Sequence, residues 1–239
     1  MFIYSAGSVG FFGEGYFFHR FYNFPKLKFI TKTLTLLPKR GYPFAVIPFG
    51  NSVWNKISLH NSGFFYWLNR YIKNGQKNDA IVSIAGSDRE ILKMVNCLNF
   101  YPEISGIELN FSCPNIKNQH NKLIPESIHP LYLKLNYKQN PFDYDLSKIN
   151  FISVNSIPTR FGGLSGKIAQ KYNWPFIEMM NKAGLKVLAS SWTSEDDINK
   201  LKDIGCKYFA IGSVILTNPR LVEKIGKDIS LGEKFNLVR

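Results

Sequence analysis

Short runs of β-branched and aromatic residues alternate with longer amphipathic segments along most of the chain. The runs are apolar over nearly their whole length, which is typical of strands that are buried on both faces of a parallel sheet. We therefore expect eight strands, at residues 1–5, 28–32, 80–85, 106–111, 131–135, 151–155, 186–190 and 208–212.

The segments between most of these runs carry apolar side chains at helical spacing. They predict helices at residues 61–73, 88–98, 168–183, 194–204 and 218–224. Ser87 is a suitable N-cap for the second helix, and Ser194 precedes acidic residues that favour a helix N-terminus. Pro175 lies within the longest helical segment and predicts a kink or an early end there.

The alternation of strands and helices predicts parallel βαβ units. Eight strands fit an α/β fold, a (β/α)8 TIM barrel formed by a single domain over residues 1–239, better than a doubly wound sheet. A flavodoxin-like or Rossmann sheet is the alternative, although no GxGxxG follows any predicted strand. The connections at residues 116–130 and 157–161 are short, so we expect a barrel that is trimmed after strands four and six.

Composition narrows the class of protein. Hydrophobic residues make up 45% of the chain, which excludes disorder as its main state. The 30 Lys and Arg residues against 17 Asp and Glu give a net charge of +13, which attracts anions such as nucleic acid, phosphate cofactors or carboxylate substrates. No compact basic block is present, so nucleic acid is not the favoured partner.

The chain shows no pattern typical of export or of membrane insertion. We find neither an apolar run of membrane-spanning length nor a signal peptide at the N-terminus. Three cysteines, Cys97, Cys113 and Cys206, give no disulfide framework, and the four histidines have no metal-ligand spacing. We therefore expect a cytoplasmic protein with free thiols, no membrane partner and no metal.

The active site of a TIM barrel lies at the C-terminal ends of its strands. The predicted strands place two lysines, four asparagines and Cys113 there. Asparagine amides match a ring with alternating C=O and N–H groups, and lysines stabilise negative charge. A thiol flanked by lysines can act as base or nucleophile. In the alternative interpretation, Cys113 is a small buried hydrophobe and the asparagines form turns.

Ten segments in the same order resemble the dihydroorotate dehydrogenase family. They are YSAG (4–7), ITKTLT (30–35), PKRG (38–41), WN (54–55), LHNSG (59–63), SIAG (83–86), ELNFSCPN (108–115), LKL (133–135), VNS (154–156) and GGLSG (162–166). The combination of ELNFSCPN with ITKTLT and VNS is the most specific part of this resemblance.

The resemblance implies an FMN-dependent oxidoreductase that converts dihydroorotate to orotate in pyrimidine biosynthesis. Its catalytic residues would be Cys113, Lys32 and Lys134, with Cys113 as the base that removes the C5 proton while hydride passes from C6 to flavin N5. A cysteine at this position is similar to the soluble class of the family. A homodimer is compatible with the resemblance.

The resemblance also implies two sets of binding residues. The substrate would contact Asn55, Asn110, Asn115, Asn155 and Ser156. The FMN cofactor would contact Ala6, Gly7, Lys32, Asn110, Lys134, Val154, Gly162, Gly163, Ser190, Ser191, Gly212 and Ser213.

One departure from the family concerns the FMN phosphate. The family has a Gly-Gly pair where this chain has Ser190 and Ser191, and serine adopts a positive φ less readily than glycine. Two alternatives therefore stay open. One is a flavin enzyme that acts on RNA, similar to tRNA-dihydrouridine synthases, although ITKTLT, VNS and GGLSG match it less well. The other is a degenerate, flavin-free barrel.

Overall fold

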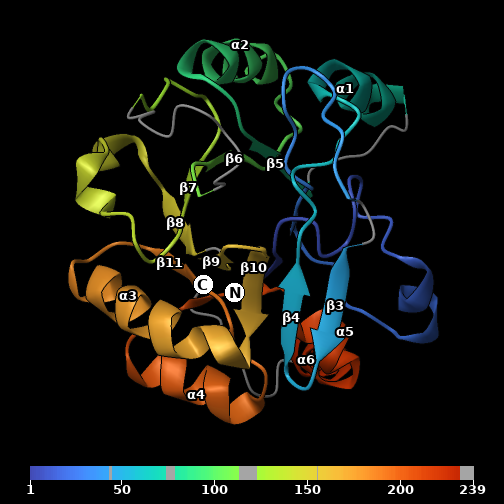
Figure 1. The fold of residues 1–239 in the computed structure, drawn as a ribbon, viewed down its shortest axis with the longest axis vertical. Coiled ribbons are helices and arrows are strands. Elements are labelled where there is room, and N and C mark those ends of the chain that lie inside the picture. Colours follow the sequence, from blue (N-terminus) through green and yellow to red (C-terminus); the bar gives the residue numbers. More distant parts are fainter. Residues whose placement is uncertain (43–44, 74–78, 113–122, 155, 232–239) are drawn as a thin grey trace.

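Eight parallel strands form a closed barrel in the computed structural model, which describes residues 1–42, 45–73, 79–112, 123–154 and 156–231 (Figure 1). The ring order is β1-β12-β11-β8-β7-β6-β5-β2. Each strand lies within one of the eight predicted runs, so the predicted TIM barrel is confirmed. The strands are β1 (Phe2–Tyr4), β2 (Phe29–Ile30), β5 (Ala80–Ile84), β6 (Gly106–Asn110), β7 (Leu131–Leu135), β8 (Phe151–Val154), β11 (Val187–Ala189) and β12 (Tyr208–Ile211).

Helices surround the barrel on the outside (Figure 1). The α-helices of the described residues are α1 (Phe64–Lys73), α2 (Asp88–Leu98), α3 (Gln170–Lys182), α4 (Glu195–Asp203), α5 (Val214–Thr217) and α6 (Pro219–Leu231). Short 3-10 helices are η1 (Phe17–Phe21), η2 (Pro141–Asp143), η3 (Leu146–Lys148) and η4 (Lys167–Ala169). None of the helices in the described part of the chain is both long and apolar enough to cross a bilayer.

The helix boundaries follow local capping chemistry. The Ser87 hydroxyl accepts from the Glu90 backbone N–H, and the Glu90 carboxylate accepts from the Ser87 backbone N–H at 2.8 Å, which completes a capping box before α2. Ser194 caps α4 through the backbone N–H of Asp197. The prediction of an early helix end at Pro175 is wrong, because α3 continues to Lys182 and buries an apolar face that includes Ile177.

The barrel has two apolar layers that share its strands. The outer faces of the strands and the inner faces of the helices form the larger core. Inside the barrel, a smaller cluster contains Ile3, Ile30, Ile81, Tyr132, Leu188 and Ala210. These six residues come from six different strands, so the barrel is filled at this level by packed side chains.

A second, four-stranded sheet was not predicted from the sequence. It has the order β3-β4-β10-β9, with β3 (Val46–Phe49), β4 (Ser52–Asn55), β9 (Ile157–Thr159) and β10 (Gly162–Gly166). Residues 157–161, expected as a short connection, are part of the β9–β10 hairpin. After β6, the described residues 123–130 contain no helix, as the trimmed connection predicts.

The small sheet joins two opposite sides of the barrel. Its hairpins follow β2 and β8, which stand four places apart in the ring of eight. Strands β4 and β10 pair antiparallel, with Asn55 opposite Gly163 and Ser52 opposite Gly166. Both hairpins follow C-terminal strand ends, so this sheet brings their loops together at the end of the barrel where active sites form.

Candidate active site

A layer of polar side chains lies directly above the apolar cluster inside the barrel. Residues two apart on a strand point to the same face, so the next inward positions are fixed by the apolar ones. Above Ile81 lies Ser83, above Tyr132 lies Lys134, and above Leu188 lies Ser190. The barrel interior therefore changes from apolar to polar toward its C-terminal mouth.

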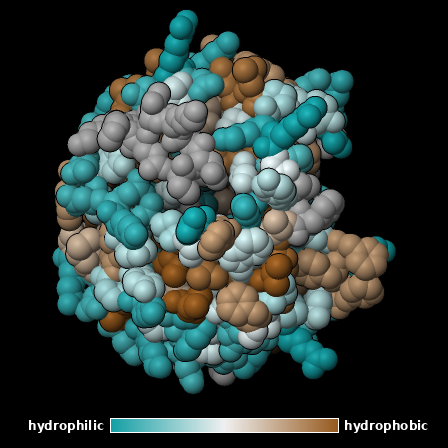
Figure 2. Space-filling model, viewed as in Figure 1, coloured by the Kyte–Doolittle hydropathy of each residue, from teal (hydrophilic) through white to brown (hydrophobic). Residues whose placement is uncertain are grey.

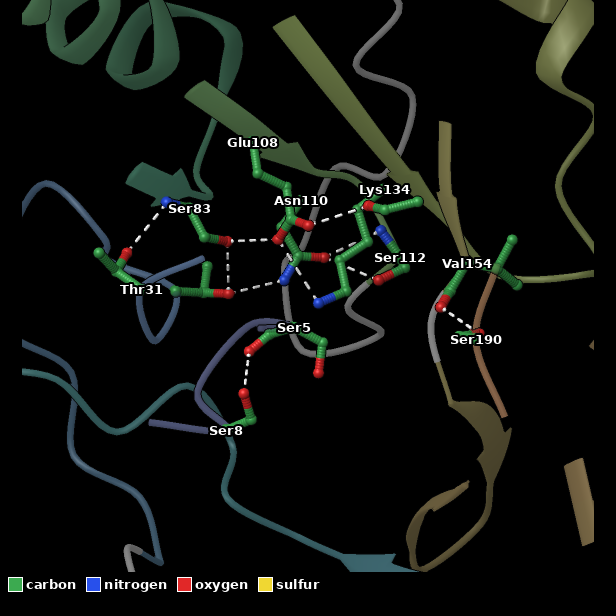
Figure 3. Close-up of polar contacts among 12 residues, drawn as sticks. Ser5, Ser8, Thr31, Ser83, Glu108, Asn110, Ser112, Lys134, Val154 and Ser190 are labelled. Carbon is green, nitrogen blue, oxygen red and sulfur yellow. Dashed lines mark hydrogen bonds and ion pairs between the residues drawn. The ribbon is translucent and has the colours of Figure 1, made fainter. Parts of the chain in front are cut away.

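Glu108 is the centre of this polar layer (Figure 3). Its Oε1 accepts from the Ser83 hydroxyl at 2.7 Å, and its Oε2 accepts from the Ser153 hydroxyl at 2.9 Å. The ammonium of Lys134 lies 3.5 Å from Oε1. Because the carboxylate is almost fully buried, these three donors replace the water that a charge would otherwise require.

A directional chain of hydrogen bonds leads from Ser112 to Glu108 (Figure 3). The Ser112 hydroxyl donates to Asn110 Oδ1 at 2.7 Å, and Asn110 Nδ2 donates to Thr33 Oγ1 at 2.9 Å. Thr33 and Ser83 hydroxyls lie 2.9 Å apart. Since Ser83 uses its own proton on Glu108, Thr33 is the donor in this step. The residue before Cys113 is thus connected to the buried carboxylate.

Lys32 enters the mouth from the end of β2 and is half-buried. Burial lowers its pKa, and the charge of Glu14 partly offsets this effect. Its ammonium lies 5.0 Å from the centre of the Phe11 ring. A Cβ at Gly7, which has a φ of +78°, would lie 3.0 Å from Lys32 Cγ, so glycine is needed where this backbone passes the lysine.

The turn after β11 carries Ser190 and Ser191, at the positions where the resemblance implies a glycine pair. Ser191 has a φ of +68°, a left-handed conformation that is uncommon for residues other than glycine. The Ser190 hydroxyl donates to the carbonyl of Val154 at 3.1 Å (Figure 3). Directly after the neighbouring strand β12, a Cβ at Gly212 would lie only 2.8 Å from Ser5 Oγ. The turns after β11 and β12 both follow C-terminal strand ends, so their backbone lies at the mouth of the barrel.

Asp197 anchors the same region from helix α4. Its Oδ2 accepts from the Thr193 backbone and hydroxyl, both at 2.8 Å, and from Gln170 at 2.7 Å. Burial raises the pKa of Asp197, but the hydrogen bonds from Thr193 and Gln170 and the charge of Lys167 together hold it below its ordinary value. The carboxylate therefore stays charged and fixes the chain just after Ser191.

The small sheet brings four further predicted residues together. Asn55 Nδ2 donates to the Gly163 carbonyl at 3.5 Å. A Cβ at Gly163 would lie 2.6 Å from Ser156 Oγ, so Ser156 lies directly against this glycine. Gly162 has a φ of +145° and passes close to the Asn55 carbonyl. The β4–β10 pairing thus assembles Asn55, Ser156 and the glycine pair at one place.

Three predicted residues lie outside the described part of the chain: Cys113, Asn115 and Asn155. Of the others, Ala6 packs against the inner apolar cluster, and Ser213 directly precedes α5.

Figure 2 shows the molecule in the orientation of Figure 1, with a hollow near the centre of the face that is bordered by hydrophilic residues.

A cavity of about 740 Å³ lies away from this mouth, on the outer side of the barrel. Its lining includes Tyr4, Phe29, Tyr71 and several aromatic residues of the segment after β1. None of the site residues predicted from the sequence and described by the structure lines it. The candidate active site is therefore the polar mouth of the barrel and not this cavity.

Several residues of the polar layer were missed in the sequence. Glu108, Ser83 and Ser153 stand inside apolar runs, at positions where the rest of the strand is buried. A charged or hydroxyl residue inside an otherwise apolar strand is a pattern from which these three residues could have been predicted. The α3 residues Gln170 and Asn173 carried no comparable signal, because they lie in an amphipathic helix.

Comparison with known proteins finds the same family that the sequence motifs resemble. The family model described as "Dihydroorotate dehydrogenase" matches residues 3–138. The catalytic subunit of dihydroorotate dehydrogenase B (NAD(+)) from Geobacter metallireducens is 33% identical over 114 residues, which are 46% of this chain and 37% of that protein. Its counterpart from Bacteroides thetaiotaomicron is 35% identical over 116 residues, 45% of this chain and 37% of that protein. The matches thus span little more than a third of each relative.

Solved structures share the fold. Ligand-free dihydroorotate dehydrogenase from Eimeria tenella has a TM-score of 0.67 and 14% identity, over 87% of this chain and 79% of that one. The same enzyme in complex with ferulenol has a TM-score of 0.67 and 12% identity, over 87% and 76% of the two chains. At this identity the likeness concerns the barrel fold alone.

Proposed function

This chain belongs to the dihydroorotate dehydrogenase family, and we propose that it is an FMN-dependent oxidoreductase that oxidises dihydroorotate to orotate in pyrimidine biosynthesis. The observation that carries the proposal is the polar layer inside the barrel. Lys134 and Asn110, which the resemblance assigns to cofactor and substrate, lie side by side in β7 and β6. Both fall within the region that the family model matches.

The residues present are compatible with FMN. The turns at Ser190–Ser191 and Gly212–Ser213 would hold the phosphate, and the left-handed Ser191 resembles the backbone nests that bind anions. Ala6, Gly7, Lys32, Asn110, Lys134, Val154, Gly162 and Gly163 would surround the ring system. When bound, FMN would supply the acceptor for the hydride that leaves the substrate.

The two lysines would hold positive charge where negative charge has to be accommodated. Lys134 is paired with Glu108, so its position inside the barrel is fixed before any ligand arrives. Lys32 is different, because burial disfavours its charged form and Glu14 only partly compensates. An anionic ligand beside Lys32 would relieve this cost, which favours binding of a carboxylate substrate or of the flavin.

Asn110 would offer one remaining hydrogen bond to the substrate ring. Its Oδ1 already accepts from the Ser112 hydroxyl at 2.7 Å and from the Ser112 backbone at 3.3 Å. One proton of Nδ2 is used on Thr33. The second proton is available for a ring carbonyl, since an amide NH2 donates twice. Asn55, Asn115, Asn155 and Ser156 would complete the contacts to the ring and its carboxylate.

Cys113 would act as the base that removes the C5 proton. It follows Ser112, which is buried and held through both its backbone N–H and its hydroxyl. This double attachment restricts the chain immediately before the thiol. A base has to lie within hydrogen-bonding reach of the proton that it removes, so such a restriction would favour the reaction.

The test is the rate at which dihydroorotate reduces bound flavin, measured anaerobically by stopped-flow absorbance. This half-reaction does not depend on the final electron acceptor. We expect Cys113→Ala to slow reduction by about 100-fold or more, the range of general base catalysis. Cys97→Ala is the matched control, because Cys97 lies on helix α2 outside the barrel and its replacement leaves the rate unchanged. An unchanged rate in Cys113→Ala would overturn the assignment of the base.

A further inference from the structure

Ser191 combines a strained backbone with two hydrogen bonds from buried side chains. It is one of three residues other than glycine with positive φ in the described part of the chain. A left-handed conformation disfavours serine because of its Cβ, so it persists only where the surroundings enforce it. What enforces it here lies on helix α3.

Two buried amides of α3 hold Ser191, one through its hydroxyl and one through its carbonyl. Asn173 Nδ2 donates to the Ser191 hydroxyl at 3.0 Å, and Gln170 Nε2 donates to the Ser191 carbonyl at 3.0 Å. Residues three apart lie on one face of a helix, so both amides reach the same turn. Gln170 also donates to Asp197 at 2.7 Å, which fixes its own orientation.

The attachment depends on the serine side chain. A glycine at this position would adopt the left-handed conformation without help, but it would offer no hydroxyl to Asn173. A serine has the hydroxyl but needs the anchor. Ser191 stands where the resemblance implies a glycine, and the buried Asn173 binds its hydroxyl. The hydrogen bond from Asn173 thus stabilises a conformation that glycine would adopt without it.

We propose that Asn173 and Gln170 are positioning residues, which hold Ser191 in its left-handed conformation and thereby keep the backbone N–H groups of this turn directed at the phosphate of FMN. The inference rests on the proposed function for the identity of the anion. It predicts that the two amides contribute to recognition of the phosphate without touching it.

The experiment compares FMN with riboflavin, which lacks the phosphate, by titrating each against the cofactor-free protein and following flavin fluorescence. The ratio of the two dissociation constants isolates the phosphate contribution. We expect a native preference for FMN of at least about tenfold. Ser191→Ala keeps the Cβ that disfavours the left-handed conformation but loses the hydroxyl that Asn173 holds, so the turn relaxes and the preference falls by roughly tenfold. Ser191→Gly keeps the preference within about threefold of the native ratio.

Asn173→Ala is expected to behave like Ser191→Ala, and combining Asn173→Ala with Ser191→Gly restores the preference. Asn181→Ala is the matched control, because Asn181 lies on the same helix and donates to the Ile204 carbonyl instead. Its ratio should equal the native one. Thermal unfolding without cofactor provides a second readout: Asn173→Ala lowers Tm in the native background more than in the Ser191→Gly background.

Equal losses of FMN preference in Ser191→Ala and Ser191→Gly would overturn the inference, and so would a native protein that does not distinguish FMN from riboflavin. Failure of the proposed function gives a different result. In that case FMN is bound with the predicted selectivity, but dihydroorotate does not bleach it.

Discussion

The ammonium of Lys134 lies 3.5 Å from Glu108 Oε1 inside the barrel, where the two side chains are only 11% and 1% exposed. The strands fix this pairing, because Asn110 of β6 is in register with Lys134 and Glu108 lies two residues earlier on the same face. Ser83 of β5 and Ser153 of β8, the two strands that flank the β6–β7 pair, complete the hydrogen bonding of the carboxylate. The buried Lys134 ammonium therefore has a counter-ion, Glu108, that the fold itself holds in place.

Removal of the carboxylate should be strongly destabilising. Glu108→Leu leaves Lys134 buried without a partner, and we expect the free energy of unfolding to fall by about 3–5 kcal/mol in urea titrations. Glu108→Gln keeps an acceptor for one serine and should lose less. Glu126→Gln is the control, since its pair with Lys148 is exposed to solvent and contributes little to stability. A Glu108→Leu protein as stable as the native one would show that the pair is not a structural requirement.

A substitution at Gly7 tests whether the close approach of its backbone to Lys32 matters for flavin binding. Gly7 and Gly184 both have a φ of +78°, but a Cβ at Gly184 would meet nothing within 4 Å. Alanine at either position should cost about 1–2 kcal/mol of stability through the backbone alone. Only Gly7→Ala should also displace Lys32 and weaken flavin binding. If both variants bind flavin equally well, the close approach to Lys32 has no role in the site.

His19 gives a pH dependence with a defined sign. Its Nδ1 accepts from the Tyr16 backbone N–H at 3.0 Å, and burial lowers its pKa from 6.5 to about 4. The unfolded chain takes up this proton first as pH falls, so stability decreases between pH 6.5 and about 4. In His19→Gln this part of the decrease should be absent in unfolding curves measured across that range. The same decrease in both proteins would assign it to other groups.

The barrel strands could be predicted because each is a mostly apolar run that is buried on both faces. The small sheet could not be found in this way. Strand β3 is mostly exposed, and β10 is glycine-rich, so neither shows the apolar pattern of a buried strand. One usable signal was Gly50-Asn51 between two β-prone runs, which is typical of a tight hairpin turn.

The site could be predicted only in part, for a related reason. Lys134 and Asn110 were predicted as site residues because they end or interrupt strands. The structure places them in register on neighbouring strands, and their roles stay predictions. Glu108 was missed although it lies in the same segment, because its role depends on side chains of neighbouring strands. Asn173 acts on Ser191 across 18 positions, and no local pattern encodes such a contact. Cys113 remains a prediction from the sequence.

The most direct test of the central proposal is an anaerobic visible absorbance spectrum of the purified protein with FMN, recorded before and after dihydroorotate is added. The proposal predicts a bound-flavin band that bleaches on addition of substrate, at a rate that depends on Cys113. A bound flavin that stays oxidised would contradict the proposed substrate, and tRNA would be tested next. A protein that binds no flavin would contradict the proposed cofactor and favour a degenerate barrel.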